Sequence, residues 1–216
     1  GKMLLGINDS QNWTSSSVSL FTRLVENGAK VINLSLFAGI YGEEAALIIA
    51  KLVNNGYDFI AVQAAGNIPE EDSQYNGLFC TITDEIAEKV ASETGLTAED
   101  ITGRKICVAA STKTESGYCY AGFSSVGETV DIAAPGKNVY TTGDNNTYYY
   151  AEGTSFATPI VTGITTLVWR ANTKLTGPEV KSIVCNNKNT KYKVGPSSGD
   201  PTVPTTFVFN SKTYYL

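Results

Sequence analysis

Strand-like and helix-like segments alternate from the start of the sequence to about residue 65, and this alternation restricts the fold more than any other feature. Continuous apolar runs predict strands, and apolar residues spaced three or four apart predict helices. Such a chain forms a mostly parallel sheet with helices on both faces, so we expect a three-layer αβα fold of the α/β class. The predicted strands cover residues 2–7, 31–36 and 59–65, and the predicted helices cover residues 16–27 and 43–54.

Later segments continue the pattern. Residues 154–173 are apolar on most sides, which predicts a long helix in the middle of the core. Thr176 and Glu179 form a capping box that opens a last helix. We expect one domain over residues 1–187 and a C-terminal tail, residues 188–216, that packs on it. Further predictions are an acidic helix over 84–94 inside a long connection over 68–103, strands over 106–110, 130–133, 207–209 and 213–215, and a hairpin over 138–150.

The composition excludes several classes of protein. The 216 residues are 42% hydrophobic and 17% charged, which is typical of a compact domain rather than a disordered chain. A net charge of −5 without a Lys/Arg cluster argues against nucleic acid as a partner, and no apolar run is long enough to cross a membrane. The four cysteines, at 80, 107, 119 and 185, match no zinc pattern, so we expect buried thiols or disulfides. Low charge with many Ser, Thr, Asn and Tyr suits a secreted or cell-surface protein.

The strongest candidate for chemistry is Ser155, in the run Gly-Thr-Ser-Phe-Ala-Thr-Pro at residues 153–159. It lies where a loop enters the long helix, and the first N–H groups of a helix can bind negative charge. We expect Pro159 in the first turn, where its missing N–H costs little. Taken alone, a serine at this position is more often a helix cap than a nucleophile.

A second candidate is Asn67, which ends the run Ala64, Ala65, Gly66, Asn67 after a buried strand. Ligands bind beyond the carboxyl ends of strands in parallel sheets, so the Asn67 amide can donate into such a crevice. The alternative is an ordinary turn asparagine after glycine.

Four runs together resemble the subtilase family of serine peptidases in order and spacing. The resemblance extends over about residues 2–185 and implies a subtilisin-like fold that lacks its N-terminal part. The runs are Gly-Ala-Lys-Val-Ile-Asn-Leu-Ser-Leu at 28–36, Ala-Ala-Gly-Asn at 64–67, Phe-Ser-Ser-Val-Gly at 123–127 with Ile-Ala-Ala-Pro-Gly at 132–136, and the run at 153–159 followed by Gly163.

The resemblance assigns roles to these residues. It implies that Ser155 is the nucleophile and that Asn67 is the oxyanion-hole side chain. The family's structural calcium ions are also implied, although no carboxylate cluster here identifies a site and we predict no other cofactor. The edge that pairs with the substrate backbone corresponds to Ser35, Leu36 and Phe37, and a wall of the primary specificity pocket corresponds to Ala64, Ala65 and Gly66.

The catalytic triad is incomplete, because the sequence contains no histidine. In the family the triad Asp and His precede the segment that resembles residues 2–7, and the distance to Asn33 fits this alignment better than one that makes Asp9 the triad Asp. Nothing in the sequence places Lys137, Lys174 or Glu152 as a substitute base. We therefore expect this chain alone to be inactive as a peptidase.

Three readings of function remain. The chain is part of an active secreted endopeptidase whose Asp and His lie upstream, or a pseudopeptidase that binds peptides or partners, or a structural domain. The first is favoured, because without the Asp strand the sheet would expose backbone and apolar surface. We expect an upstream segment or a second copy of the chain to fill that gap, and a protein or peptide as substrate.

Overall fold

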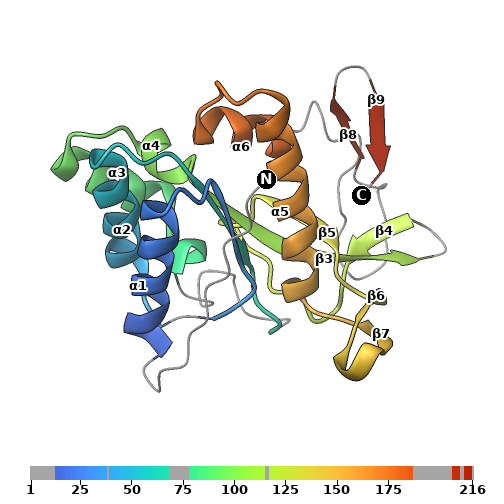
Figure 1. The fold of residues 1–216 in the computed structure, drawn as a ribbon. Coiled ribbons are helices and arrows are strands. Elements are labelled where there is room, and N and C mark those ends of the chain that lie inside the picture. The colour runs from blue at the N-terminus through green and yellow to red at the C-terminus, as the bar shows by residue number, and fades with distance from the viewer. Residues whose placement is uncertain are drawn as a thin grey trace.

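The computed structural model of the chain describes residues 13–37, 39–68, 78–114, 117–186, 206–209 and 212–215. These residues form the three layers that the sequence predicts, with a central sheet between two groups of helices (Figure 1). The strand predicted over residues 2–7 lies outside the described residues.

The sheet of the described part has five strands and is mostly parallel. Strand β2 pairs in parallel with β1 and β3, and β3 also pairs in parallel with β5 and antiparallel with β4. Along β3, successive side chains are buried on both faces, which explains its continuous apolar sequence. The strands are β1 (Val31–Leu34), β2 (Ile60–Ala64), β3 (Lys105–Thr114), β4 (Gly117–Tyr120) and β5 (Ile132–Pro135).

One face of the sheet carries most of the helices (Figure 1). They meet β1 and β2 through a core in which Phe21, Phe59 and Phe79 pack ring against ring, with centroids 5.5 and 4.9 Å from Phe21. The elements are α1 (Trp13–Glu26), α2 (Gly42–Asn54), the short 3₁₀ turn η2 (Leu78–Thr81), α3 (Asp84–Thr94) and α4 (Ala98–Thr102).

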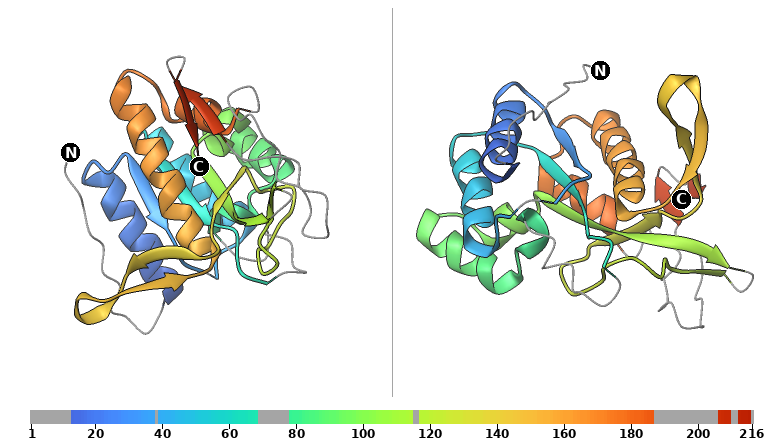
Figure 2. Two further views of the ribbon diagram at one scale, coloured as in Figure 1. Left: turned by 90° about the vertical axis from the view of Figure 1, so that its right-hand side faces the viewer. Right: turned by 90° about the horizontal axis from the view of Figure 1, so that it is seen from below.

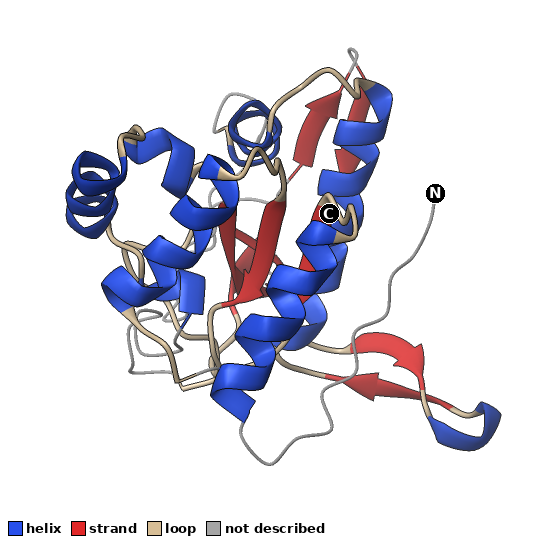
Figure 3. Cartoon of the chain, turned by 60° about the vertical axis from the view of Figure 1, so that its left-hand side comes forward, coloured by secondary structure: helices blue, strands red, loops and turns tan. Residues whose placement is uncertain are grey.

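The opposite face is covered by α5 (Thr154–Ala171) and α6 (Gly177–Cys185) (Figure 3). Helix α5 buries Val161 and Val168 against the sheet. Its other side is open in the described part of the chain, since Leu167 is 64% exposed. The sequence places this helix in the middle of a core, whereas the structure packs it on one side only.

Two hairpins complete the described residues. The first joins β6 (Val139–Thr142) and β7 (Tyr148–Ala151) through a 3₁₀ turn, Asp144–Asn146, and projects from the body (Figure 2). It was predicted, as were β8 (Thr206–Phe209) and β9 (Lys212–Tyr215), which pair with each other. Whether the tail packs on the domain stays a prediction.

Local sequence signals explain both the correct boundaries and the omissions. Helix α3 has the predicted bounds, because Thr83 caps its N-terminus and Gly95 adopts the left-handed conformation at its end. The predicted capping box of α6 is confirmed, with the N–H of Thr176 donating to the Glu179 carboxylate at 2.7 Å. Helix α4 and strand β4 were not predicted, because they are too short to show a clear period.

A buried charge cluster holds β3, β5 and α6 together. The Asp131 carboxylate lies 3.2 Å from Lys105 Nζ and 2.6 Å from Lys181 Nζ, and it accepts the N–H of Cys107 at 2.7 Å. Burial alone would raise the pKa of Asp131, but the two lysines outweigh it and hold that pKa below its ordinary value. The negative charge of Asp131 is therefore balanced by the two lysines. Losing that charge leaves both ammonium groups hydrogen-bonded to backbone carbonyls but without the opposite charge of Asp131.

We predict that Asp131→Asn destabilises the chain by about 3–5 kcal/mol, because breaking a buried ion pair strands the remaining charges. Asp131 has a lowered pKa in the folded protein, so its contribution is present above the unfolded value of about 4 and is lost as the pH falls further. Urea unfolding at pH 7 should give a clearly lower free energy of unfolding for the variant than for wild type. The difference between the two free energies should shrink as the pH falls below 4. Equal stability at neutral pH would contradict this assignment.

Candidate active site

The residues singled out in the sequence lie where the carboxyl ends of β1 and β2 meet the N-terminus of α5. Ser35 directly follows β1, Asn67 ends the loop after β2, and Ser155 lies in the first turn of α5. Parallel strands have their carboxyl ends at one edge of the sheet, so residues distant in sequence become neighbours.

The side chain of Asn67 is anchored to the start of α5. Its Oδ1 accepts hydrogen bonds from the N–H of Thr154 at 2.8 Å and from the Thr154 hydroxyl at 2.9 Å. Because an N–H can only donate, this contact fixes which amide atom is the oxygen and directs Nδ2 away from Thr154. Among the described residues, neither Asn67 Nδ2 nor Ser155 Oγ has a hydrogen-bond partner.

Gly153 allows this close approach. Its φ is 144°, a conformation that side chains rarely adopt, and a Cβ there would lie 3.3 Å from Asn67 Nδ2. Its N–H donates to the carbonyl of Gly136 at 2.8 Å, which attaches the base of the β6–β7 hairpin to the loop after β5. The glycine thus keeps the space beside the Asn67 amide clear.

The Ser155 carbonyl needs a hydrogen-bond donor from outside its own helix, and Ser35 provides it. In a helix this carbonyl would accept the N–H of residue 159, but Pro159 has none. The hydroxyl of Ser35 donates to the Ser155 carbonyl instead, at 2.8 Å. The expectation that Pro159 lies in the first turn was therefore wrong: it lies inside α5, and the Ser35 hydroxyl supplies the missing donor.

Sequence reasoning missed the residues that hold Ser35. The Asn33 amide donates to Ser35 Oγ at 3.0 Å, and its oxygen accepts the Thr162 hydroxyl at 3.1 Å. These bonds join β1 to the third turn of α5. Asn33 lay inside a recognised run. Its bond to Thr162, which is 129 residues away, could not be found from the sequence.

The residues predicted to form a pocket wall run along the end of β2. Ala64 and Ala65 are buried, and Gly66 has a φ of 115°. The N–H of Gly66 donates to the Thr154 hydroxyl at 3.2 Å, and its carbonyl accepts the N–H of Ser125 at 3.0 Å. Ser125, to which no role was given, thus holds the loop through the Gly66 carbonyl, while α5 holds it through the Gly66 N–H.

The remaining predicted site residues are less constrained. Leu36 packs against the core of α1 and α2, while Phe37 is 58% exposed at the open end of β1. In the described part of the chain, Glu152, Lys137 and Lys174 form no hydrogen bond with Ser155, and Asp9 lies outside it.

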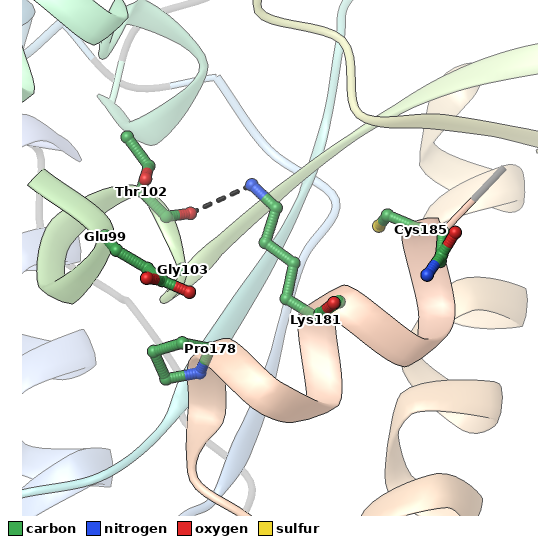
Figure 4. Close-up of a pocket in the computed structure, with 8 residues that line it drawn as sticks. Glu99, Thr102, Gly103, Pro178, Lys181 and Cys185 are labelled. Carbon is green, nitrogen blue, oxygen red and sulfur yellow. Dashed lines mark hydrogen bonds between the residues drawn. The ribbon is translucent and has the colours of Figure 1, made fainter.

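A pocket of about 290 Å³ lies at the far end of the sheet, between α4 and α6 (Figure 4). Lys181 crosses it to donate to the Thr102 carbonyl at 2.9 Å, and loss of solvent around the Cys185 thiol raises the pKa of that group to about 12. Because Gly103 precedes β3, this pocket lies at the amino-terminal end of the sheet, away from Ser155. It is lined by Glu99, Thr102, Gly103, Pro178, Lys181, Ser182, Cys185 and Asn186.

The described residues contain neither a metal-binding cluster nor a membrane-spanning helix. No three His, Cys, Asp or Glu side chains in them gather closely enough to hold a metal ion, so no residue is assigned to calcium. None of the helices described is long and apolar enough to cross a membrane.

Known proteins resemble this chain over most of its length. Subtilisin DY of Bacillus licheniformis is 30% identical over 179 residues, which are 82% of this chain and 56% of that protein. Thermitase of Thermoactinomyces vulgaris is 29% identical over 167 residues, 76% of this chain and 49% of that protein. The chain thus spans about half the length of these relatives.

Solved structures agree on the fold. A cold-adapted subtilisin-like serine proteinase superposes with a TM-score of 0.61 at 22% identity, over 87% of this chain and 59% of that one. The subtilase cytotoxin SubAB gives 0.63 at 21%, over 91% of this chain and 62% of that one. The sequence model of the subtilase family matches residues 3–209, which reaches into the C-terminal tail. The chain therefore belongs to the subtilase family.

Proposed function

We propose that this chain is the part of a subtilisin-like serine endopeptidase domain that carries the nucleophile, Ser155, and an oxyanion-hole donor, Asn67. The observation that carries the proposal is the bond from the Thr154 N–H to Asn67 Oδ1, 2.8 Å long, because it leaves Nδ2 available beside the helix of Ser155. A helix cap alone does not need such an arrangement, since capping Thr154 requires neither the Asn67 amide nitrogen nor the Ser155 hydroxyl to be without a partner among the described residues.

The proposed reaction uses these groups in order. Ser155 Oγ attacks the carbonyl carbon of the scissile peptide, and the carbonyl oxygen becomes negative. Asn67 Nδ2, the Ser155 N–H and the positive end of α5 offset that charge. The serine proton passes to a base and then to the leaving amine, and water later releases the acyl group from Oγ.

The substrate is proposed to lie along the end of β1. The backbone of Ser35, Leu36 and Phe37 is the proposed edge that pairs with the substrate backbone. The hydrogen bond from the Ser35 hydroxyl to the Ser155 carbonyl supports this, because it holds the segment beside the proposed nucleophile. The loop of Ala64, Ala65 and Gly66 is offered as one wall of the pocket for the residue before the cut. Its attachment to Thr154 and Ser125 supports a rigid wall.

The base of this reaction must come from outside the sequence, which has no histidine. Removing the triad histidine from a subtilisin costs on the order of 10⁶ in turnover, and the oxyanion hole alone retains only 10³–10⁴ over water. We therefore propose that the chain alone is inactive.

We further propose that a segment bearing the triad Asp and His packs on β1 and the open side of α5. Within the described residues β1 pairs on one side only, and Leu167 is largely exposed. Glycine weakens a helix, and among the described residues no neighbour explains Gly163, because a Cβ there would meet none of them within 4 Å. A second copy of the chain could cover this surface but could not supply an imidazole.

The proposal extends to the tail and the location of the protein. The family match reaches residue 209, which supports a tail, residues 188–216, packed on the same domain. A charged fraction of 17% supports a secreted or cell-surface protein.

Labelling with a fluorophosphonate tests the proposal. The chain alone should react negligibly, whereas the chain reconstituted with the Asp- and His-bearing segment should be modified stoichiometrically at Ser155.

In the reconstituted protein, Asn67→Leu should slow peptide hydrolysis by about 10²–10³, because the charge on the oxyanion loses a donor. Asn27→Leu, at an exposed amide at the end of α1, is the matched control and should keep the wild-type rate. Peptide binding without any labelling of the complete protein would instead identify a pseudopeptidase.

A substitution at Gly163 tests the completing segment separately. Gly163→Ala should stabilise the chain alone by up to about 1 kcal/mol, because alanine favours the helix and its methyl group has open space. The same substitution should weaken binding of the segment, measured by titration calorimetry, because that space is then needed. Ser92→Ala, on the exposed face of α3, should stabilise the chain without changing binding. Unchanged affinity of the Gly163 variant would place the segment elsewhere.

A further inference from the structure

The turn η2 is pressed onto the face of the sheet opposite α5. The N–H of Phe79 donates to the buried Gln63 side chain at 2.9 Å, and the Cys80 thiol lies 3.5 Å from the Ala64 carbonyl. Cys107 is paired with Gln63 in the register of β2 and β3, so its side chain shares that face. Two cysteines from different segments are thus brought to one point beneath the end of β2.

Both thiols are completely buried in one small cluster with Ala65, Ala109 and Ala133. We propose that Cys80 and Cys107 are a disulfide-forming pair, which becomes covalently linked when the protein folds under oxidising conditions. The inference is independent of the proposed peptidase activity.

The other cysteines are placed differently. Cys119 lies on β4 opposite Thr112, and Cys185 ends α6 on the α5 side of the sheet. A sheet lies between Cys185 and the pair, so the positions favour one linkage out of the six that four cysteines allow. The sequence spacing alone could not select it.

The linkage forms by thiol–disulfide exchange. A Cys80 or Cys107 thiolate attacks a small disulfide such as oxidised glutathione, and the second cysteine displaces the remaining thiol. The protein gains one S–S bond, and the glutathione disulfide leaves as two thiols. Burial, together with the Cys107 thiol, raises the pKa of Cys80 well above its ordinary value, so thiolate is scarce in the folded chain. Exchange therefore belongs to folding, before η2 closes over the sheet.

The bond would tie the end of the long connection after β2 to the centre of the sheet. It closes a chain loop that contains α3 and α4, and it lies directly below the loop of Ala64 and Ala65. Such a closure stabilises mainly by restricting the unfolded chain. A stable η2 would in turn keep the proposed pocket wall in place.

Refolding the full chain in a glutathione redox buffer tests the pair. The product is denatured without reductant, alkylated with iodoacetamide and weighed by mass spectrometry. Two alkyl groups should be found on the four cysteines, and proteolysis should release a peptide pair joined through Cys80 and Cys107. Four alkylated cysteines at every glutathione ratio, or a linkage between other residues, would overturn the proposal.

Cysteine variants identify the linked pair even if one of them folds less efficiently. Cys80→Ala should leave three alkylated cysteines, whereas the control Cys119→Ala should leave one and retain the linked peptide. Reduction with a phosphine should lower the Tm of wild type and of Cys119→Ala by roughly 10 °C and leave Cys80→Ala unchanged. An equal response of all three proteins would show that no linkage between Cys80 and Cys107 supports the fold.

Discussion

The contact between Asn67 and Thr154 joins the two halves of the site. It links the end of a buried strand to the first N–H of a helix that starts almost ninety residues later. The amide oxygen is consumed by this contact, so the orientation of the amide nitrogen is no longer free. Gly153 keeps the adjacent space open, because any side chain there would approach that nitrogen.

The rest of the fold holds the two halves in place. At the near end, Ser35 replaces the donor that Pro159 lacks, so the chain just after β1 is attached to the helix at Ser155, the proposed nucleophile. At the far end, Asp131 joins Lys105 and Lys181 and fixes the strands from below. The sheet between these ends is buried on both faces and therefore rigid. A site built on such a frame needs little reorganisation when charge develops.

Sequence reasoning succeeded where the signal is local. The alternation of periods predicts the layers. The four runs single out Ser155, Asn67 and Ser35, which the fold brings together and whose roles stay a prediction. It failed where a residue's role depends on a distant partner: Asn33 needs Thr162, and Ser125 needs Gly66. It placed the start of the long helix correctly at Thr154 but assigned Pro159 to the first turn, although Pro159 lies beyond it, where the Ser35 hydroxyl replaces the missing donor. The contact between Cys80 and Cys107 belongs to the same class, since only the fold brings η2 over β3.

The most direct measurement is a crystal structure of the protein, completed by its Asp- and His-bearing segment, with a peptide boronic acid bound. The boronate mimics the tetrahedral intermediate, and its oxygen occupies the place of the developing negative charge. We predict a covalent bond to Ser155 Oγ and an oxygen within about 3.1 Å of both Asn67 Nδ2 and the Ser155 N–H. A boronate oxygen directed away from Asn67, with the Thr154 contact still intact, would contradict the assignment.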